Sequence, residues 1–279
     1  MSAQAGFLLN EIFAAVFAAA LYPFRGFHPG AGLTAVSALS GAALLLVFKK
    51  TSNQGRIAEI RDRIRGLLLE IRIFRHDLGV VFRAQRGILL QTLVYMRYSL
   101  SPLAFIAPPV AVILIHLTPY YGYRPLMPGE TAVISMKVDA GAALTAADVK
   151  LTVPDGLRVD APFFRASDMG EIAWRLTVEA PGRYEVGISV GGAVLAKEVV
   201  AGAGVMKVSP VRRRGGFWSA FAGGGEPPLP PDGPVESVRI AYGAREDAFF
   251  GWKMHWVVPF FLLTLISGFG LRGLFRVEI

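Results

Sequence analysis

The chain has 279 residues, of which 53% are hydrophobic and 18% are charged, and it has no cysteine. This composition is more apolar than that of an average soluble domain. The absence of cysteine excludes disulfide bonds and thiolate chemistry, so any exported part of the chain must be held together by its own core.

The positive charge of the chain is concentrated in one region. Residues 49–98 carry eleven Lys and Arg against four acidic residues, whereas residues 119–251 carry fourteen against fifteen. Short basic loops between apolar segments stay in the cytoplasm, so we predict a cytoplasmic position for residues 49–101. A basic surface for nucleic acid is the less favoured interpretation, because aromatic interleaving and a recognised binding motif are lacking. We therefore predict no specific nucleic-acid partner.

Residues 1–30 are predicted to form an N-terminal apolar helix, at 5–22, followed by a turn rich in Pro, Gly and aromatic residues. A cleaved signal peptide fits poorly, since no basic residue precedes the apolar run. The helix contains Asn10 and Glu11 and is only long enough to just cross a bilayer. We favour a helix that is tilted or lies in the membrane interface, and a full span is the alternative.

Residues 31–48 are predicted to be a transmembrane helix, since they carry no charge and are followed by Lys49 and Lys50. Ser37, Ser40 and Gly41 are small enough to let a neighbouring helix approach closely. A plain lipid-facing anchor is the alternative for this helix.

Residues 49–101 are predicted to form a basic cytosolic helical hairpin. Apolar residues recur at alternating steps of three and four, a heptad pattern typical of a coiled coil. Since both ends join apolar runs that would leave the same membrane face, the segment must double back, and we expect the turn near residues 76–79. A helix lying flat on the lipid is the alternative. The predicted seam consists of Ile57, Ile60, Ile64, Leu67, Ile71, Phe74, Leu78, Val81, Gln85, Ile88, Thr92 and Tyr95.

Residues 102–122 are predicted to be a second transmembrane helix, kinked or broken at Pro108 and Pro109 because proline removes backbone donors. His116 lies in this helix. We favour a hydrogen bond from His116 to a neighbouring helix, and a proton relay is the alternative.

Residues 123–214 contain short runs of alternating polarity separated by Gly, Pro and Asp, which predicts an exported β-sandwich of the immunoglobulin-like class. Trp174 is a candidate core residue. Arg212, Arg213 and Arg214 form either a lipid- or partner-binding patch or, as we favour, a solvated loop.

Residues 215–251 are predicted to be a Gly/Pro-rich loop with a returning strand at 237–242. Phe217, Trp218 and Phe221 would be costly if exposed, so we expect them to pack on the sandwich or to contact the membrane or an exported partner. Residues 252–279 are predicted to be the last transmembrane helix with a short basic tail, with Trp252 and Trp256 at the outer interface. Arg272 and Arg276 would mark the cytoplasmic end.

The predicted fold class is thus an α-helical membrane protein of three transmembrane helices and an N-terminal interfacial or spanning helix. It adds a cytosolic antiparallel helical hairpin and an exported β-sandwich. We expect a multi-pass protein of the cytoplasmic membrane, with the hairpin and C-terminus cytoplasmic and the β-domain periplasmic or extracellular.

No catalytic constellation is recognisable in the sequence. The four histidines, His28, His76, His116 and His255, are scattered without metal-ligand spacing, and phosphate-binding loops and nucleophile-elbow motifs are absent. We therefore predict no enzyme activity, no catalytic residue, no metal and no cofactor.

The order of segments resembles the minimal core of the Oxa/YidC/Get-type insertase superfamily. The matching residues are FKKTSNQ at 48–54, the hairpin, Ser101-Pro102, Gly251-Trp252 and Leu271-Arg272. The resemblance covers about half the chain and is nearest to the three-span branch, which includes archaeal YidC-like proteins and the third subunit of the ER membrane complex. Two features depart from the family. Residues 31–48 lack the positive groove residue that members often carry, and the β-domain lies between the second and third spans.

Two functions follow as expectations. In the first, the protein is a YidC-like insertase or chaperone for membrane proteins, with membrane lipids and client proteins as partners. Its groove would use Thr34, Ser37, Ser40 and His116, and the ribosome, a targeting factor or a nascent chain would contact Arg61, Arg65, Arg72 and Arg75. In the second, it is a non-catalytic scaffold subunit of an envelope complex whose β-domain binds an exported partner through Phe217, Trp218 and Phe221.

Overall fold

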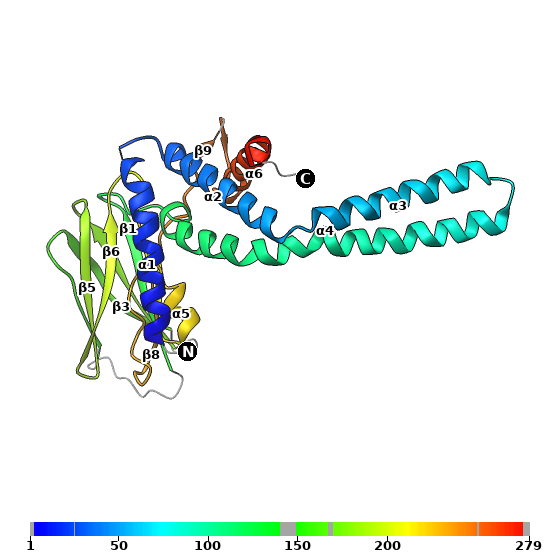
Figure 1. The fold of residues 1–279 in the computed structure, drawn as a ribbon. Helices are drawn as coiled ribbons and strands as arrows, with labels where there is room; N and C mark the ends of the chain where they lie inside the picture. The colour runs from blue at the N-terminus through cyan, green and yellow to red at the C-terminus, as the bar shows by residue number, and fades with distance from the viewer. Residues whose placement is uncertain (1–2, 25, 140–148, 167–169, 250, 276–279) are drawn as a thin grey trace. The chain divides into compact units, whose positions relative to one another are not determined.

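The computed structural model describes residues 3–24, 26–139, 149–166, 170–249 and 251–275, which divide into two compact units (Figure 1). The first unit comprises Met1–Val36 and Leu114–Phe260, and the second comprises Ser37–Ile113 and Phe261–Ile279. The end of the predicted basic tail, including Arg276, lies outside the described residues.

Four helices in the described part of the chain are long and apolar enough to cross a membrane, which indicates a membrane protein. The first consists of α1 (Ala3–Leu21) and a short 3-10 turn, η1 (Tyr22–Phe24). The others are α2 (Pro29–Thr51), α4 (Leu78–Tyr121) and α6 (Val257–Phe275). Whether α1 crosses the membrane stays a prediction.

The basic segment folds into two antiparallel helices, α3 (Gln54–Ile73) and the first part of α4 (Figure 1). Asn53 Oδ1 accepts a hydrogen bond from the Arg56 amide at 3.2 Å and caps the start of α3. Asp77 Oδ1 accepts from the amides of Gly79 and Val80, at 2.9 and 3.1 Å, and caps the start of α4. The turn therefore lies at residues 74–77 and overlaps the predicted position, near residues 76–79, at its last two residues.

The contact between α3 and α4 follows most of the predicted seam, whose residues on α3 up to Ile71 are buried or half-buried, and departs from it at the turn and in part on α4. Ile60 is 5% exposed on α3, as expected, but on α4 the buried residue is Ala84, at 1%, and Gln85 is exposed. A Cβ placed on Gly87 would lie 3.0 Å from Leu67 Cδ1, so the two helices approach closely where α4 has a residue without a side chain. Phe74 and Leu78, also predicted on the seam, flank the turn and are exposed.

Of the two predicted effects of Pro108 and Pro109, the break is absent, because α4 is one continuous helix from Leu78 to Tyr121, and the kink stays a prediction. In transmembrane helices such prolines are tolerated when other groups satisfy the freed carbonyls.

In the second unit, α2 and α6 pack closely through small residues. A Cβ on Gly41 would lie 2.6 Å from the Thr264 carbonyl oxygen and 3.0 Å from Ser267 Cβ, so only glycine fits there. This confirms the prediction that the small residues of α2 admit a neighbouring helix.

The strands between Thr131 and Ile240 form a β-sandwich. The first six lie where the runs of alternating polar and apolar residues predict them. One sheet has the order β3-β4-β1-β8-β7 and the other β2-β5-β6, and every pairing within them is antiparallel. The strands are β1 (Thr131–Val138), β2 (Val149–Thr152), β3 (Leu157–Ala166), β4 (Glu171–Val178), β5 (Gly182–Val190), β6 (Ala193–Ala201), β7 (Val211–Arg213) and β8 (Val235–Ile240). A two-stranded ribbon, β9 (Ala248–Phe249) and β10 (Trp252–Lys253), precedes α6.

One hydrophobic core joins the two sheets of the sandwich. Alternate residues of β4 point into it, including Trp174, which is 4% exposed and confirms its predicted core position. Val186 and Ile188 of β5 are fully buried opposite them. β5 and β6 are joined by Gly191 and Gly192, both at positive φ, as the tightest hairpin turns require.

The Gly/Pro-rich segment lies on the sandwich and is fixed by arginines. It contains a short helix, α5 (Phe217–Phe221), and continues into β8, the predicted returning strand. Arg214 donates to both carboxylate oxygens of Asp139 at 2.7 Å and to the Gly233 carbonyl at 2.6 Å. Arg212 donates to the Pro227 carbonyl at 2.6 Å. Of the three consecutive arginines, only Arg213 is exposed, so they form neither a free patch nor a solvated loop.

Candidate functional site

The predicted partner contacts on the hairpin lie on its surface. Arg61, Arg65 and Arg72 are exposed on α3, and Arg75 is exposed in the turn. Arg65 pairs with Asp62 at 3.2 Å, and Arg75 Nε lies 3.2 Å from His76 Nε2. Such exposed pairs are weak. The guanidinium groups are therefore accessible to an anionic partner.

The predicted groove residues do not come together on one open surface. Ser37 and Ser40 are 0% and 6% exposed, and Thr34 Oγ1 donates to the Gly30 carbonyl at 2.8 Å. Ser37 lies one helical turn before Gly41, the glycine against which Thr264 packs. Neither Ser37 Oγ nor Thr264 Oγ1 has a hydrogen-bond partner among the described residues. The polar groups of α2 and α6 thus form a buried strip, and the role of Ser37 and Ser40 in a groove stays a prediction.

His116 is buried in an aromatic cluster within the first unit. Its ring stacks on Phe17 of α1, with centroids 5.6 Å apart, and lies 5.4 Å from the rings of Phe13 and Phe221. Asn10 Nδ2 donates to the Ala220 carbonyl at 3.3 Å beside this cluster. The polar residues of α1 and α4 therefore attach α1 to α5, and His116 is a packing residue, not a groove residue.

The predicted exported contact, Phe217, Trp218 and Phe221, divides into two parts. Phe221 is 6% exposed and belongs to the His116 cluster, so it is not a surface contact. Trp218 is 74% exposed. Of the three residues, Trp218 has the side chain most available to a membrane or a partner.

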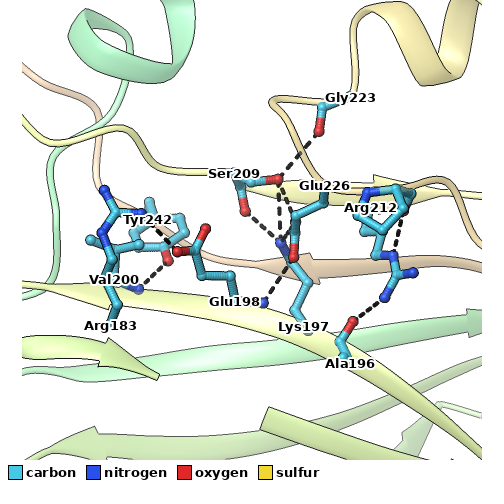
Figure 2. A network of polar contacts seen from close by, with 11 residues as sticks. Arg183, Ala196, Lys197, Glu198, Val200, Ser209, Arg212, Gly223, Glu226 and Tyr242 are labelled. Carbon is cyan, nitrogen blue, oxygen red and sulfur yellow. Dashed lines mark hydrogen bonds and ion pairs between the residues drawn. The ribbon is translucent and has the colours of Figure 1, made fainter. Parts of the chain in front are cut away.

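A polar network covers the free edge of β6, an edge strand of the three-stranded sheet (Figure 2). Glu226 Oε1 accepts from the Glu198 amide at 2.8 Å, and Tyr242 Oη accepts from the Val200 amide at 2.9 Å. The Arg212 guanidinium donates to the Ala196 carbonyl. Side chains thus occupy backbone groups that would otherwise pair with a strand from another chain.

Lys197 lies at the centre of this network and is fully buried. Its ammonium donates to the Ser209 carbonyl at 2.6 Å and to the Glu226 carboxylate, which also accepts from Ser209 Oγ at 2.5 Å. Burial lowers the pKa of Lys197, and the negative charge of Glu226 opposes that shift. Burial also raises the pKa of Tyr242. The network therefore ties the Gly/Pro-rich segment to the sandwich by a buried ion pair.

A serine and a lysine this close raise the question of Ser–Lys hydrolysis. Lys197 Nζ lies 3.4 Å from Ser209 Oγ, but the two residues are 1% and 2% exposed. The lysine is held by the Glu226 carboxylate, and the serine hydroxyl is directed to that same carboxylate. No substrate carbonyl reaches this serine, so we assign the pair a structural role. Sequence reasoning missed it because Glu226 lies 29 positions from Lys197 in a segment without regular structure.

Two cavities adjoin the network in the first unit. The larger, of about 560 Å³, lies between α1 and the loop before β7, and the other, of about 480 Å³, lies over β5 and β6. Arg183 and Gly225 line both. The larger cavity combines apolar walls with charged side chains, and it is the best-formed candidate for a ligand site.

Among the described residues, no group of three or more His, Cys, Asp or Glu is placed to hold a metal ion. No protein-family model, curated protein or solved structure matches the chain.

Proposed function

We propose that the chain is a YidC-like membrane protein that acts as an insertase or chaperone for other membrane proteins. The observation that carries the proposal is the α3–α4 hairpin, basic and exposed, which connects the apolar helix α2 directly to the apolar half of α4. The basic charge of the hairpin supports a cytoplasmic position, where clients and targeting factors would arrive. The close packing of α6 on α2 supports a three-helix core of the insertase type.

The buried strip between α2 and α6 suggests how such a protein would work without covalent chemistry. Ser37 and Thr264 keep unpaired hydroxyls inside the helix pair, where a polar group without a partner costs free energy. We propose that parting α2 from α6 exposes these hydroxyls as a polar path for the hydrophilic flank of a client. The flank would then cross the bilayer at a lower desolvation cost.

The exported domain is proposed to be immunoglobulin-like. Its orders β3-β4-β1-β8 and β2-β5-β6 correspond to D-E-B-A and C-F-G of a constant-type sandwich, with β8 in the place of the first strand. Tyr184, near the start of β5, donates from Oη to the Ala180 carbonyl at 2.7 Å. This hydrogen bond has the form of the tyrosine corner found at the E–F junction of such domains.

The test is depletion of the protein in cells, followed by pulse-labelling of membrane proteins with short exported tails. We expect these clients to accumulate uninserted, and complementation to fail with a chain carrying R61E, R65E, R72E and R75E. The matched control carries R175E and R213E on the exposed surface of the β-domain. Unchanged insertion after depletion would refute the proposal.

A scaffold subunit of an envelope complex is the second candidate, and the 74% exposure of the Trp218 side chain favours it. Purification in mild detergent at native expression separates the two functions. A stoichiometric exported partner that is lost on W218A supports the scaffold. A monomer that still crosslinks to nascent membrane proteins supports the insertase.

A further inference from the structure

The larger cavity is bounded on one side by α1 and on the other by the sandwich. Glu11, Ala14, Ala15 and Ala18 form the α1 wall, and Arg183 and Lys207 lie on the sandwich side. The three alanines leave room because they have no side chain beyond Cβ. The lining of the cavity therefore combines small apolar side chains with side chains of both charges.

Two of its charged side chains, Lys207 and Glu11, make no hydrogen bond or salt bridge with any described residue. Lys207 is nevertheless largely withdrawn from water, and this burial lowers its pKa. The carboxylates of Glu198, Glu11 and Glu226 oppose that shift from a distance. A Cβ at position 225 would collide with Lys207 Nζ, so the ammonium lies directly against the Gly225 backbone. Burying a charge that lacks a direct hydrogen-bonded partner costs free energy, which an anionic ligand group would recover.

Arg183 adds a second cation to the lining, although Glu198 already engages it at 2.7 Å. Among the described residues that line the cavity, Glu11 on α1 is the one acidic side chain. The cavity thus offers two cationic groups and one carboxylate, which matches a zwitterion better than a simple anion.

The surface next to the cavity indicates that this zwitterion carries acyl chains. On α1, Leu8, Ile12 and Val16 are each about 60% exposed and follow one face of the helix. Ala15, which belongs to the α1 wall of the cavity, lies about one helical turn from Ile12 of this stripe. A ligand head group in the cavity could therefore extend its chains along the apolar stripe.

We propose that this cavity binds one phospholipid with a primary-ammonium head group, its phosphate at Lys207 and Arg183 and its ammonium at Glu11. The acyl chains would then lie on the exposed apolar face of α1. This site is separate from the hairpin and from the proposed groove, and it does not depend on the insertase function.

The test is titration of the full-length protein in detergent with short-chain dihexanoyl lipids, followed by native mass spectrometry. We expect one dihexanoyl phosphatidylethanolamine per chain. K207M should weaken binding by about tenfold or more, since a charge-assisted hydrogen bond contributes about 1.5–3 kcal/mol. K207R should restore most of the affinity. K150M and E246Q, which remove exposed charges elsewhere in the same unit, are the matched controls and should have no effect.

The choice of lipid distinguishes the parts of the site. E11Q should weaken phosphatidylethanolamine binding and leave dihexanoyl phosphatidylglycerol, which lacks an ammonium, unchanged. A18F should block both lipids by filling the cavity. If K207M and K150M bind dihexanoyl phosphatidylethanolamine with equal affinity, the site is overturned. If glycerophosphoethanolamine, which has no acyl chains, binds as tightly as the dihexanoyl lipid, the assignment to a lipid is overturned. If A18F fails to fold, the K207M and K207R comparison still decides.

Discussion

The β-sandwich and the helical second unit differ in how much of their apolar side-chain surface is buried. In the sandwich, large side chains such as Trp174 and Ile188 are buried in one core, and even the edge of β6 is covered by side chains. In the second unit, Leu93, Phe105 and Ile266 are between 57% and 66% exposed. The sandwich covers its own large apolar side chains and is compatible with water, whereas the helices need lipid or a partner to cover theirs.

The largest effect is expected where a core residue is removed from the sandwich. Trp174→Ala should lower the free energy of unfolding of the β-domain by about 3–5 kcal/mol, because it leaves a cavity between the sheets. Leu93→Ala on the hairpin should change stability by less than about 0.5 kcal/mol in detergent. Thermal unfolding followed by limited proteolysis measures both. A large loss for Leu93→Ala would show that the second unit buries this face.

The second-largest effect on stability is expected when the buried ion pair between Lys197 and Glu226 is broken. Glu226→Ala leaves the Lys197 ammonium unpaired in the interior, so we expect a loss of about 3 kcal/mol and protease sensitivity in residues 215–236. The double variant K197M/E226Q should recover most of that stability, since no charge is then left buried. Glu59→Gln, which breaks an exposed pair on α3, should have almost no effect. Additive losses in the double variant would contradict the coupling.

A smaller effect tests whether the second unit has any tightly packed position. Gly41→Val should destabilise the α2–α6 pair by about 1–3 kcal/mol, because its side chain would meet the backbone of α6. Gly66→Ala on α3, where nothing lies within 4 Å, should instead stabilise by up to about 1 kcal/mol. Melting temperatures in detergent compare the two. Equal effects would mean that α2 and α6 do not pack at Gly41.

The smallest effect concerns the hydrogen bond of Tyr184. Tyr184→Phe removes the bond to the Ala180 carbonyl and should cost the sandwich about 1 kcal/mol without altering its fold. Tyr95→Phe on the hairpin is the control, with no loss expected. Urea unfolding of the β-domain signal resolves a difference of this size. An unchanged midpoint would remove one support for the immunoglobulin-like assignment.

Local patterns in the sequence predicted the elements well and their contacts less well. Two-residue alternation identified β1 to β6 and the inward position of Trp174, because a strand places alternate side chains on one face. The heptad pattern located α3, but it put Gln85 on the seam, where the structure has Ala84. The pattern counts apolar side chains, whereas close helix packing selects small ones.

The candidate sites were harder to predict, because they depend on residues far apart in the chain. The roles of Lys197, Glu226 and Tyr242 arise only when a Gly/Pro-rich segment lies along β6. His116 was placed in a groove from its position in an apolar run, and only the approach of α1 and α5 shows it to be a packing residue. Likewise, the opposite charges of Glu11 and Lys207 face one cavity although 196 positions separate them.

The sandwich begins and ends at one place. Tyr123 and Ala244 form an antiparallel bridge, and the Arg124 amide donates to the Gly243 carbonyl at 3.0 Å. Two chain segments about 120 residues apart thus leave the domain side by side, as in a cassette inserted into a host protein. Because both ends of such a cassette lie together, its sequence can change without altering the path of the helices that flank it.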